Sequence, residues 1–187
     1  MDDDRPDQEN LAKPLIGVSR CLLGDPVRYD GESKRCRWIT DMLSLHCDFL
    51  PICPEVESGL GVPRPALRLV GSTHHPRALG VTDSRLDVTE PLLRYAARTL
   101  PRLQSVSGMI LKARSPSCGI FDTPVFSDSG EEPVLGGGLF TRALLEAYPD
   151  LPVIDETGLE SESARVGFLI QVFRHCCRQR SHPANRA

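Results

Sequence analysis

Four short apolar runs, separated by stretches with helical periodicity, constrain the fold of this chain more than any other feature. The runs are LIGVS at 15–19, FLPIC at 49–53, GMILK at 108–112 and LPVID at 151–155. Short continuous runs bounded by turn residues are typical of strands that are buried on both faces. Helical patterns follow them at 33–47, 90–103, 139–148 and 161–177. This alternation predicts an α/β fold of the Rossmann or flavodoxin type, with a mainly parallel sheet of about four to five strands and helices on both faces.

The length of the chain limits the number of domains. Its 187 residues suffice for one domain with a full hydrophobic core and are too few for two comfortable ones. We predict a single α/β domain over 14–178. The polar segments at 1–13 and 179–187 are expected to be disordered tails outside the core.

Composition and charge exclude several kinds of partner. With a net charge of -3, the chain gives no reason to expect a nucleic acid duplex or an anionic membrane as partner. No apolar run approaches the roughly 20 residues of a membrane span, and the acidic N-terminus is unlike a signal peptide. We therefore expect a cytoplasmic protein. No sequence feature indicates an oligomeric state.

Three of the seven cysteines lie where predicted strands end. Cys21, Cys53 and Cys118 stand at or a few residues past the ends of the first three runs, in the loops SRCLLGDPVRYDG, ICPEVESGLGVPRP and KARSPSCG. Ligands of open α/β sheets bind outside the carboxyl ends of the strands, so these three thiols can meet there. In a reducing compartment, metal binding or thiol chemistry is the better expectation for such a set than disulfides.

The remaining cysteines do not share this placement. Cys36 and Cys47 lie on the apolar stripe of the predicted helix at 33–47, where cysteine acts as a small hydrophobic residue. Cys176 and Cys177 are adjacent in a predicted helix, and their side chains point about 100 degrees apart. These two cysteines are therefore a poor pair of ligands.

The residues leave several chemistries open for the three strand-end cysteines. They are compatible with one zinc ion, completed by a histidine or water, and with a [4Fe-4S] cluster that keeps one iron without a protein ligand. A metal- or cluster-stabilised module that binds a nucleotide or a partner protein without catalysis is one alternative. Another is a thiol enzyme in which Cys118 is the nucleophile and a helix lowers its pKa. All three cysteines packing under loops is the simplest alternative.

Five strings resemble a known bacterial family. They are VSRCLLGDPVRYDG, PICPEVESGLGVPRP, LDVTEPLLRYA, GMILKARSPSCG and GGGLFTRAL, and they span most of residues 15–175. The family was long catalogued as of unknown function, and its characterised branch is the thiouracil desulfidases. The resemblance is most specific in the three cysteine loops.

The resemblance implies a cofactor, a reaction and site residues. It implies a [4Fe-4S] cluster held by Cys21, Cys53 and Cys118, whose open iron takes sulfur from a thiolated pyrimidine such as 4-thiouracil. The reaction is expected to be a hydrolysis without net electron transfer that releases hydrogen sulfide. Glu55 and Ser115 match the positions implicated in catalysis in that family.

The residues themselves suggest how these side chains act. Glu55 is the candidate proton shuttle, with Glu57 as a weaker alternative, and Ser115 is placed to orient water or substrate. Candidates for contacting the substrate or balancing the charge of a cluster are Lys112, Arg64 and Ser117. The pair His74 and His75 lies in a polar loop and is expected to be solvent-exposed, and the glycines at 136–138 are only a weak signal for an anion at a helix N-terminus.

Overall fold

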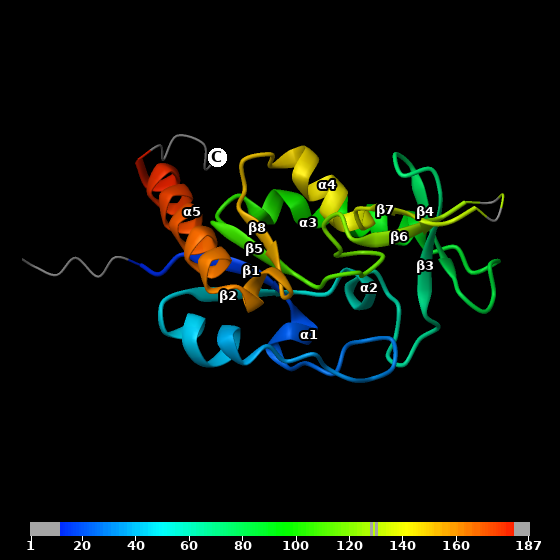
Figure 1. Ribbon diagram of the computed structural model, residues 1–187, viewed down its shortest axis with the longest axis horizontal. Helices are drawn as coiled ribbons and strands as arrows, with labels where there is room; N and C mark the ends of the chain where they lie inside the picture. The colour runs from blue at the N-terminus through cyan, green and yellow to red at the C-terminus, as the bar shows by residue number, and fades with distance from the viewer. Residues whose placement is uncertain (1–11, 128, 130, 182–187) are drawn as a thin grey trace, which may run out of the picture.

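The computed structural model describes residues 12–127, 129 and 131–181 (Figure 1). Its strands are β1 Leu15–Ser19, β2 Asp48–Ile52, β3 Leu67–Gly71, β4 Pro76–Gly80, β5 Gly108–Leu111, β6 Thr123–Phe126, β7 Val134–Gly136 and β8 Val153–Asp155. Its α-helices are α1 Arg20–Leu23, α2 Pro54–Glu57, α3 Thr89–Thr99, α4 Leu139–Ala147 and α5 Glu162–Ser181. Most of the two predicted tails lies outside the described residues, and residues 179–181 form the end of α5.

A four-stranded parallel sheet carries the carboxyl edge that the sequence predicts. Its order is β2-β1-β5-β8, and all three neighbouring pairs are parallel. Counted within this sheet, the order is 2-1-3-4, as in doubly wound sheets of the flavodoxin type. All four strands lie within two residues of the predicted runs. Parallel pairing therefore brings the residues that follow each strand to one edge.

Alternating side chains of the parallel sheet pack against helices on both faces. Ile16, Val18 and Ile110 belong to a core cluster with residues of α1 and α5. Met109 and Leu111 point to the other face and share a cluster with residues of α3 and α4. Figure 1 shows α3 and α4 on one side of this sheet and α1 on the other.

A second sheet, which the sequence analysis did not predict, lies beside the first. Its order is β4-β3-β6-β7, with two antiparallel hairpins joined by the parallel pair β3 and β6. Leu92 of α3 and Leu139 of α4 pack into its core cluster, while other residues of the same helices pack on the parallel sheet. The prediction of one mainly parallel sheet is therefore incomplete, because the fold holds two sheets that share α3 and α4.

The prediction of an α-helix at 33–47 is wrong. Only a π-helix at Trp38–Met42 and a 3-10 turn at Leu43–Leu45 form there. The backbone N–H groups of Lys34 and Cys36 donate to the carbonyls of Cys21 and Leu22, at 2.9 and 2.8 Å. These amides pair with the α1 turn, so the segment before the π-helix cannot wind into an α-helix. The apolar stripe of the predicted helix consists of Cys36, Ile39, Leu43 and Cys47, and the last three are nevertheless buried.

The other predicted helices form close to their expected positions. The predicted helix at 90–103 is α3 followed by a 3-10 turn at Leu100–Leu103, where Pro101 has no N–H to continue the α-helical ladder. A further 3-10 turn at Gly158–Glu160 precedes α5. In the part of the chain that the structure describes, no helix has the length and apolarity needed to cross a membrane.

Candidate active site

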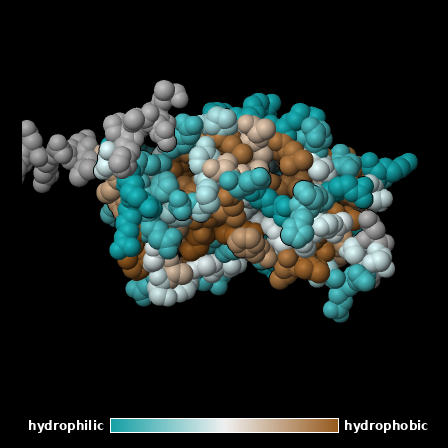
Figure 2. All heavy atoms as spheres, turned by 90° about the horizontal axis from the view of Figure 1, so that it is seen from above, coloured by the Kyte–Doolittle hydropathy of each residue, from teal (hydrophilic) through white to brown (hydrophobic). Residues whose placement is uncertain are grey.

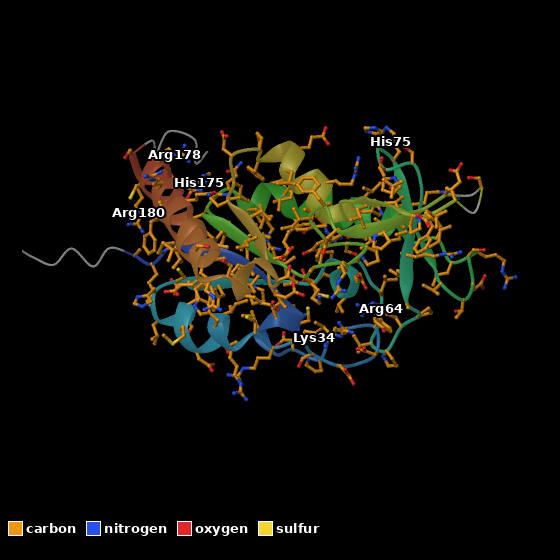
Figure 3. All side chains as sticks on the ribbon, in the orientation of Figure 1. Lys34, Arg64, His75, His175, Arg178 and Arg180 are labelled. Atoms are coloured by element: carbon orange, nitrogen blue, oxygen red, sulfur yellow. The ribbon has the colours of Figure 1, made fainter. Side chains whose placement is uncertain are left out.

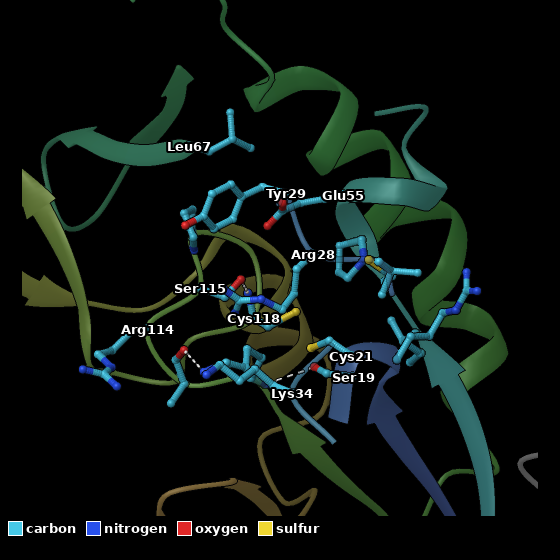
Figure 4. Close-up of a pocket in the computed structure, with 18 of the residues that line it drawn as sticks. Ser19, Cys21, Arg28, Tyr29, Lys34, Glu55, Leu67, Arg114, Ser115 and Cys118 are labelled. Atoms are coloured by element: carbon cyan, nitrogen blue, oxygen red, sulfur yellow. Dashed lines mark hydrogen bonds between the residues drawn. The ribbon is translucent and has the colours of Figure 1, made fainter. Parts of the chain in front are cut away.

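A cavity of about 470 Å³ opens at the carboxyl ends of the parallel strands, and Cys21, Cys53 and Cys118 all line it. The three cysteines come from three different loops, after β1, β2 and β5. Figure 4 shows the sulfur atoms of Cys21 and Cys118 pointing into the same space, with Ser115 beside Cys118. The fold thus brings together the three thiols that the strand-end argument singled out.

The Cys21 turn is a single helical turn closed by a glycine. Gly24 has a φ of 107°, a left-handed conformation that favours glycine, and its N–H donates to the Cys21 carbonyl. The extended segment after it adds the bond from the Lys34 N–H to the same carbonyl. Backbone bonds from two sides therefore hold Cys21, which is 8% exposed, at the cavity wall.

The Cys53 turn separates the roles of two glutamates. Cys53 precedes α2, and its N–H donates to Glu57 Oε1 at 3.0 Å. The other oxygen of Glu57 accepts the hydroxyl hydrogen bond of Tyr95 at 2.8 Å. Glu57 thus caps the helix start and anchors it to α3, whereas Glu55 lines the cavity.

The Cys118 loop is held by a side chain of its own and by the first backbone N–H groups of α4. Ser115 Oγ accepts hydrogen bonds from the N–H groups of Ser117 and Cys118, at 3.2 and 3.1 Å. The first N–H groups of α4, those of Leu139 and Phe140, donate to carbonyls of this loop. These amides are used by the protein, so the triple glycine does not present them to an anion.

A close backbone approach explains one of those glycines. A Cβ atom on Gly138 would lie 2.5 Å from the carbonyl of Ser117 and 2.8 Å from the nitrogen of Cys118. No larger residue fits there without moving the Cys118 loop.

Glu55 is fixed by two partners on its two oxygens. Arg64 donates to Oε2 from Nε and Nη2 at 2.8 and 2.7 Å, and the Ser117 hydroxyl donates to Oε1 at 3.1 Å. The side chains of Glu55 and Arg64 are 13% and 7% exposed. Arg64 lines the cavity, but its charge is directed to Glu55. Ser117 is fully buried and holds Glu55 rather than lining the cavity.

Lys112 has a partner that the sequence analysis missed. Its ammonium forms an ion pair with Glu156 and donates to the Ala113 carbonyl at 2.9 Å. The second oxygen of Glu156 accepts the N–H of Ala113 at 2.7 Å. Glu156 directly follows β8, so the strand-end argument that selected the cysteines also applies to it.

Burial keeps the three cysteines protonated in the metal-free chain. It raises the pKa of the Cys21 thiol to about 11, and nearby Lys112 and Arg28 act against this rise. Burial also raises the pKa of Cys53, and raises that of Cys118 well above its usual value against a hydrogen bond from Ser19. A thiol nucleophile needs a lowered pKa, so these environments disfavour a catalytic thiol in the metal-free chain.

In the metal-free chain, Cys21 and Cys118 should therefore react slowly with iodoacetamide at neutral pH, and the exposed Cys177 should react first. The thiolate fraction of a thiol rises about tenfold per pH unit below its pKa, so modification of Cys21 should accelerate up to pH about 11. Mass spectrometry of peptides over a pH series measures each site. Fastest labelling of Cys118 at neutral pH would restore the thiol-enzyme alternative.

The other candidates lie away from the cavity. Cys36 and Cys47 pack in the core cluster below the sheet, as predicted. His74 and His75 are exposed, also as predicted, and Figure 3 places His75 at the upper edge of the molecule, opposite the edge where Lys34 and Arg64 of the cavity lie. None of the described histidines, at 46, 74, 75 and 175, lines the cavity.

The fold and the cavity define an α/β protein with a thiol-lined site at the carboxyl edge of its parallel sheet. The model of the 2-thiouracil desulfurase family matches residues 16–156. Among solved structures, this chain is similar to the [4Fe-4S]-dependent thiouracil desulfidase TudS. The two share 33% sequence identity and a TM-score of 0.65, and the match covers 83% of this chain and 99% of that chain. No curated protein matches the sequence.

The chain therefore belongs to the 2-thiouracil desulfurase family. This confirms the resemblance recognised from the cysteine loops, and with it the prediction of a desulfidase-type enzyme.

Proposed function

We propose that this enzyme binds a [4Fe-4S] cluster through Cys21, Cys53 and Cys118 and removes sulfur from a thiolated pyrimidine such as 4-thiouracil. The observation that carries the proposal is one cavity lined by these cysteines together with Glu55 and Ser115. The similar structure, TudS, is [4Fe-4S]-dependent. The reducing cytoplasm expected from the sequence would keep the three thiols available as ligands.

The placement of the three thiols around one cavity is compatible with a cluster. Within the described residues, no three side chains of histidine, cysteine, aspartate or glutamate gather closely enough to hold one metal ion. A cluster needs its thiolates farther apart, because each of them binds a different iron. Three cysteines around one cavity, each on its own loop, are compatible with this kind of ligation.

The charge of the cavity also fits a cluster. Six basic side chains line it, against Glu55 as the acidic one; they are Arg20, Arg28, Lys34, Arg64, Lys112 and Arg114. Thiolate-bound clusters are anionic, and metal binding requires the thiols to lose their protons. Lys112 and Arg28 lie near Cys21 and favour its thiolate. Four of the six are paired with carboxylates, Arg20 with Asp25, Arg28 with Asp30, Arg64 with Glu55 and Lys112 with Glu156, so the wall is basic but partly neutralised.

When bound, the cluster would supply an iron without a protein ligand that acts as a Lewis acid toward the exocyclic sulfur of the substrate. The protein must then move protons, because water adds to the ring carbon while sulfur leaves as hydrogen sulfide. Glu55 is held at the cavity by Arg64 and Ser117. Its carboxylate takes one proton from the attacking water and delivers it to the departing sulfur, and the second proton of hydrogen sulfide comes from the hydroxyl that becomes the product carbonyl.

Ser115 and Lys112 assist from the same loop. Ser115 Oγ accepts two backbone N–H groups, so its own hydroxyl hydrogen is available to donate to water or to a ring heteroatom of the substrate. Lys112, paired with Glu156, contributes a fixed positive charge near Cys21. Glu57 has no place in this scheme, because both of its oxygens are bound outside the cavity.

The test is metal content and product formation by the reconstituted chain. After anaerobic reconstitution we expect about four iron and four sulfide ions per chain, as one [4Fe-4S] cluster requires. The loaded protein should convert 4-thiouracil to uracil and release one hydrogen sulfide per turnover, without consuming a reductant. One zinc per chain, or a loaded cluster that releases no sulfide from 2- or 4-thiouracil, would overturn the proposal.

A further inference from the structure

The outward face of α5 carries a stripe of apolar side chains. Val166, Ile170 and Phe173 are 51%, 47% and 44% exposed, and the exposed Cys177 continues the line. Their spacings of four, three and four residues are those of a seam between two packed helices. Figure 2 looks down on the side that carries α3, α4 and α5, and hydrophobic side chains reach the surface there among polar ones.

This stripe is not the face that holds α5 to the domain. Phe168, Val172 and Cys176 are the buried residues of the helix, and the first two pack in the cluster under the parallel sheet. The helix lies beyond residues 16–156, which match the family model, and none of its residues lines the cavity. Neither the core nor the reaction accounts for the exposed stripe.

We propose that α5 pairs antiparallel with α5 of a second copy of this chain, across a two-fold axis. The midpoint between 170 and 173 is also the midpoint between 166 and 177. An antiparallel pair centred there places Ile170 against the partner's Phe173 and Val166 against the partner's Cys177. Each side chain of the stripe then meets another side chain of the stripe, as an isologous interface requires.

Charges at the two ends of α5 select the antiparallel direction. Glu162 lies in the first turn of the helix and Arg180 in the last. Eighteen residues are five helical turns, so both side chains lie on the same flank. The antiparallel pair puts Glu162 within one residue of the partner's Arg180, twice by symmetry, whereas a parallel pair would place the two Glu162 side chains at the same end. Arg180 also donates a hydrogen bond to the Ala12 carbonyl, and its guanidinium has further N–H groups for the carboxylate. Figure 3 shows Arg178 and Arg180 at the C-terminal end of α5.

The composition of the N-terminal segment disfavours it as the occupant of the stripe. Residues 1–11 carry five acidic side chains, and their only large apolar ones are Met1 and Leu11. Such a segment cannot cover a seam of four side chains about three turns long. The second copy offers a complementary apolar stripe of the same length.

Sedimentation velocity of the full chain over a concentration series tests the proposal. The parent should reach twice its 20.6 kDa mass. Ile170→Glu should shift it to a monomer, because it buries two carboxylates in the seam. Sulfide release should change less than twofold, since the stripe is remote from the cavity. The control is Leu93→Glu, which changes a 41% exposed apolar residue on α3 and should leave the dimer intact.

Cross-linking tests the direction of pairing. Val166→Cys should form an intermolecular disulfide with native Cys177 under mild oxidation, and Val166→Cys combined with Cys177→Ser should not. A parent that stays monomeric at every concentration, or a dimer that survives Ile170→Glu, would refute the interface. A dimer in which Val166→Cys fails to cross-link would refute the antiparallel arrangement. Loss of sulfide release is a separate result that bears on the cavity alone.

Discussion

Replacing Cys21, Cys53 or Cys118 by serine should remove the cluster and sulfide release together. Serine is a hard oxygen donor with a very high pKa, so it replaces a thiolate on iron poorly. Altering residues that only orient a ligand typically costs about 10–100-fold in metal affinity or activity, and loss of a direct ligand should exceed that. Iron and acid-labile sulfide per chain, visible absorbance after anaerobic reconstitution and the rate of sulfide release measure the effect.

The matched control for these variants is Cys36→Ala. Cys36 is half-buried near the Cys21 turn and packs against the core cluster below the sheet, but it does not line the cavity. Its backbone N–H, which bonds to the α1 turn, is unchanged by the substitution. The control should therefore keep its iron and its rate. If any of the three serine variants binds a full complement of iron and turns over like the parent, the assignment of that ligand is wrong.

The parallel sheet and its functional edge could be predicted because both follow from local patterns. A buried parallel strand reads as a short apolar run, and right-handed connections gather the strand ends at one edge. The cysteine loops could thus be brought together without coordinates. The same reasoning should have selected Glu156, which directly follows VID in the fourth run. A single glutamate past a strand is a weak signal, because acidic residues are common on the exposed loops of any soluble protein.

The second sheet escaped prediction because its strands carry weak or contrary signals. Pro124 argues against a central strand, since proline cannot donate to a ladder. In the structure, pairing of β6 with β3 begins only at Val125, so Pro124 lies before that ladder. The β7 strand has only three residues, and the β3–β4 connection lacks the Asn-Gly signal of tight hairpins. Tertiary packing on α3 and α4 supplies what these local signals lack.

The choice between Glu55 and Glu57 also needed coordinates. Residues two apart on a helix point about 200 degrees from each other, so only one of the pair can face a given cavity. The rotation of a one-turn helix about its own axis cannot be predicted from its sequence. The bonds from the Cys53 N–H and the Tyr95 hydroxyl to Glu57 fix that rotation and turn Glu55 toward the cavity.

Glu55→Gln should leave the cluster in place and slow sulfide release by about 10²–10⁴-fold, the usual contribution of a positioned acid or base. Glutamine keeps the shape of the side chain but cannot take a proton from water. Iron per chain and initial rates with 4-thiouracil separate loss of the cofactor from loss of proton transfer. Glu90→Gln, a change of an exposed carboxylate on α3, is the matched control and should alter neither.

This substitution also leaves Arg64 buried without its counter-charge, and breaking a buried ion pair costs about 3–5 kcal/mol. A slow variant could then be slow because it is unstable, which the double variant Glu55→Gln with Arg64→Gln resolves. Removing both charges should recover much of the free energy of unfolding, measured by denaturant titration, because no uncompensated charge stays buried. The rate should remain low, since the proton acceptor is still absent. If instead the rate returns with stability, Glu55 serves only to hold Arg64 and the loop around Cys53, and the proton must move through another group.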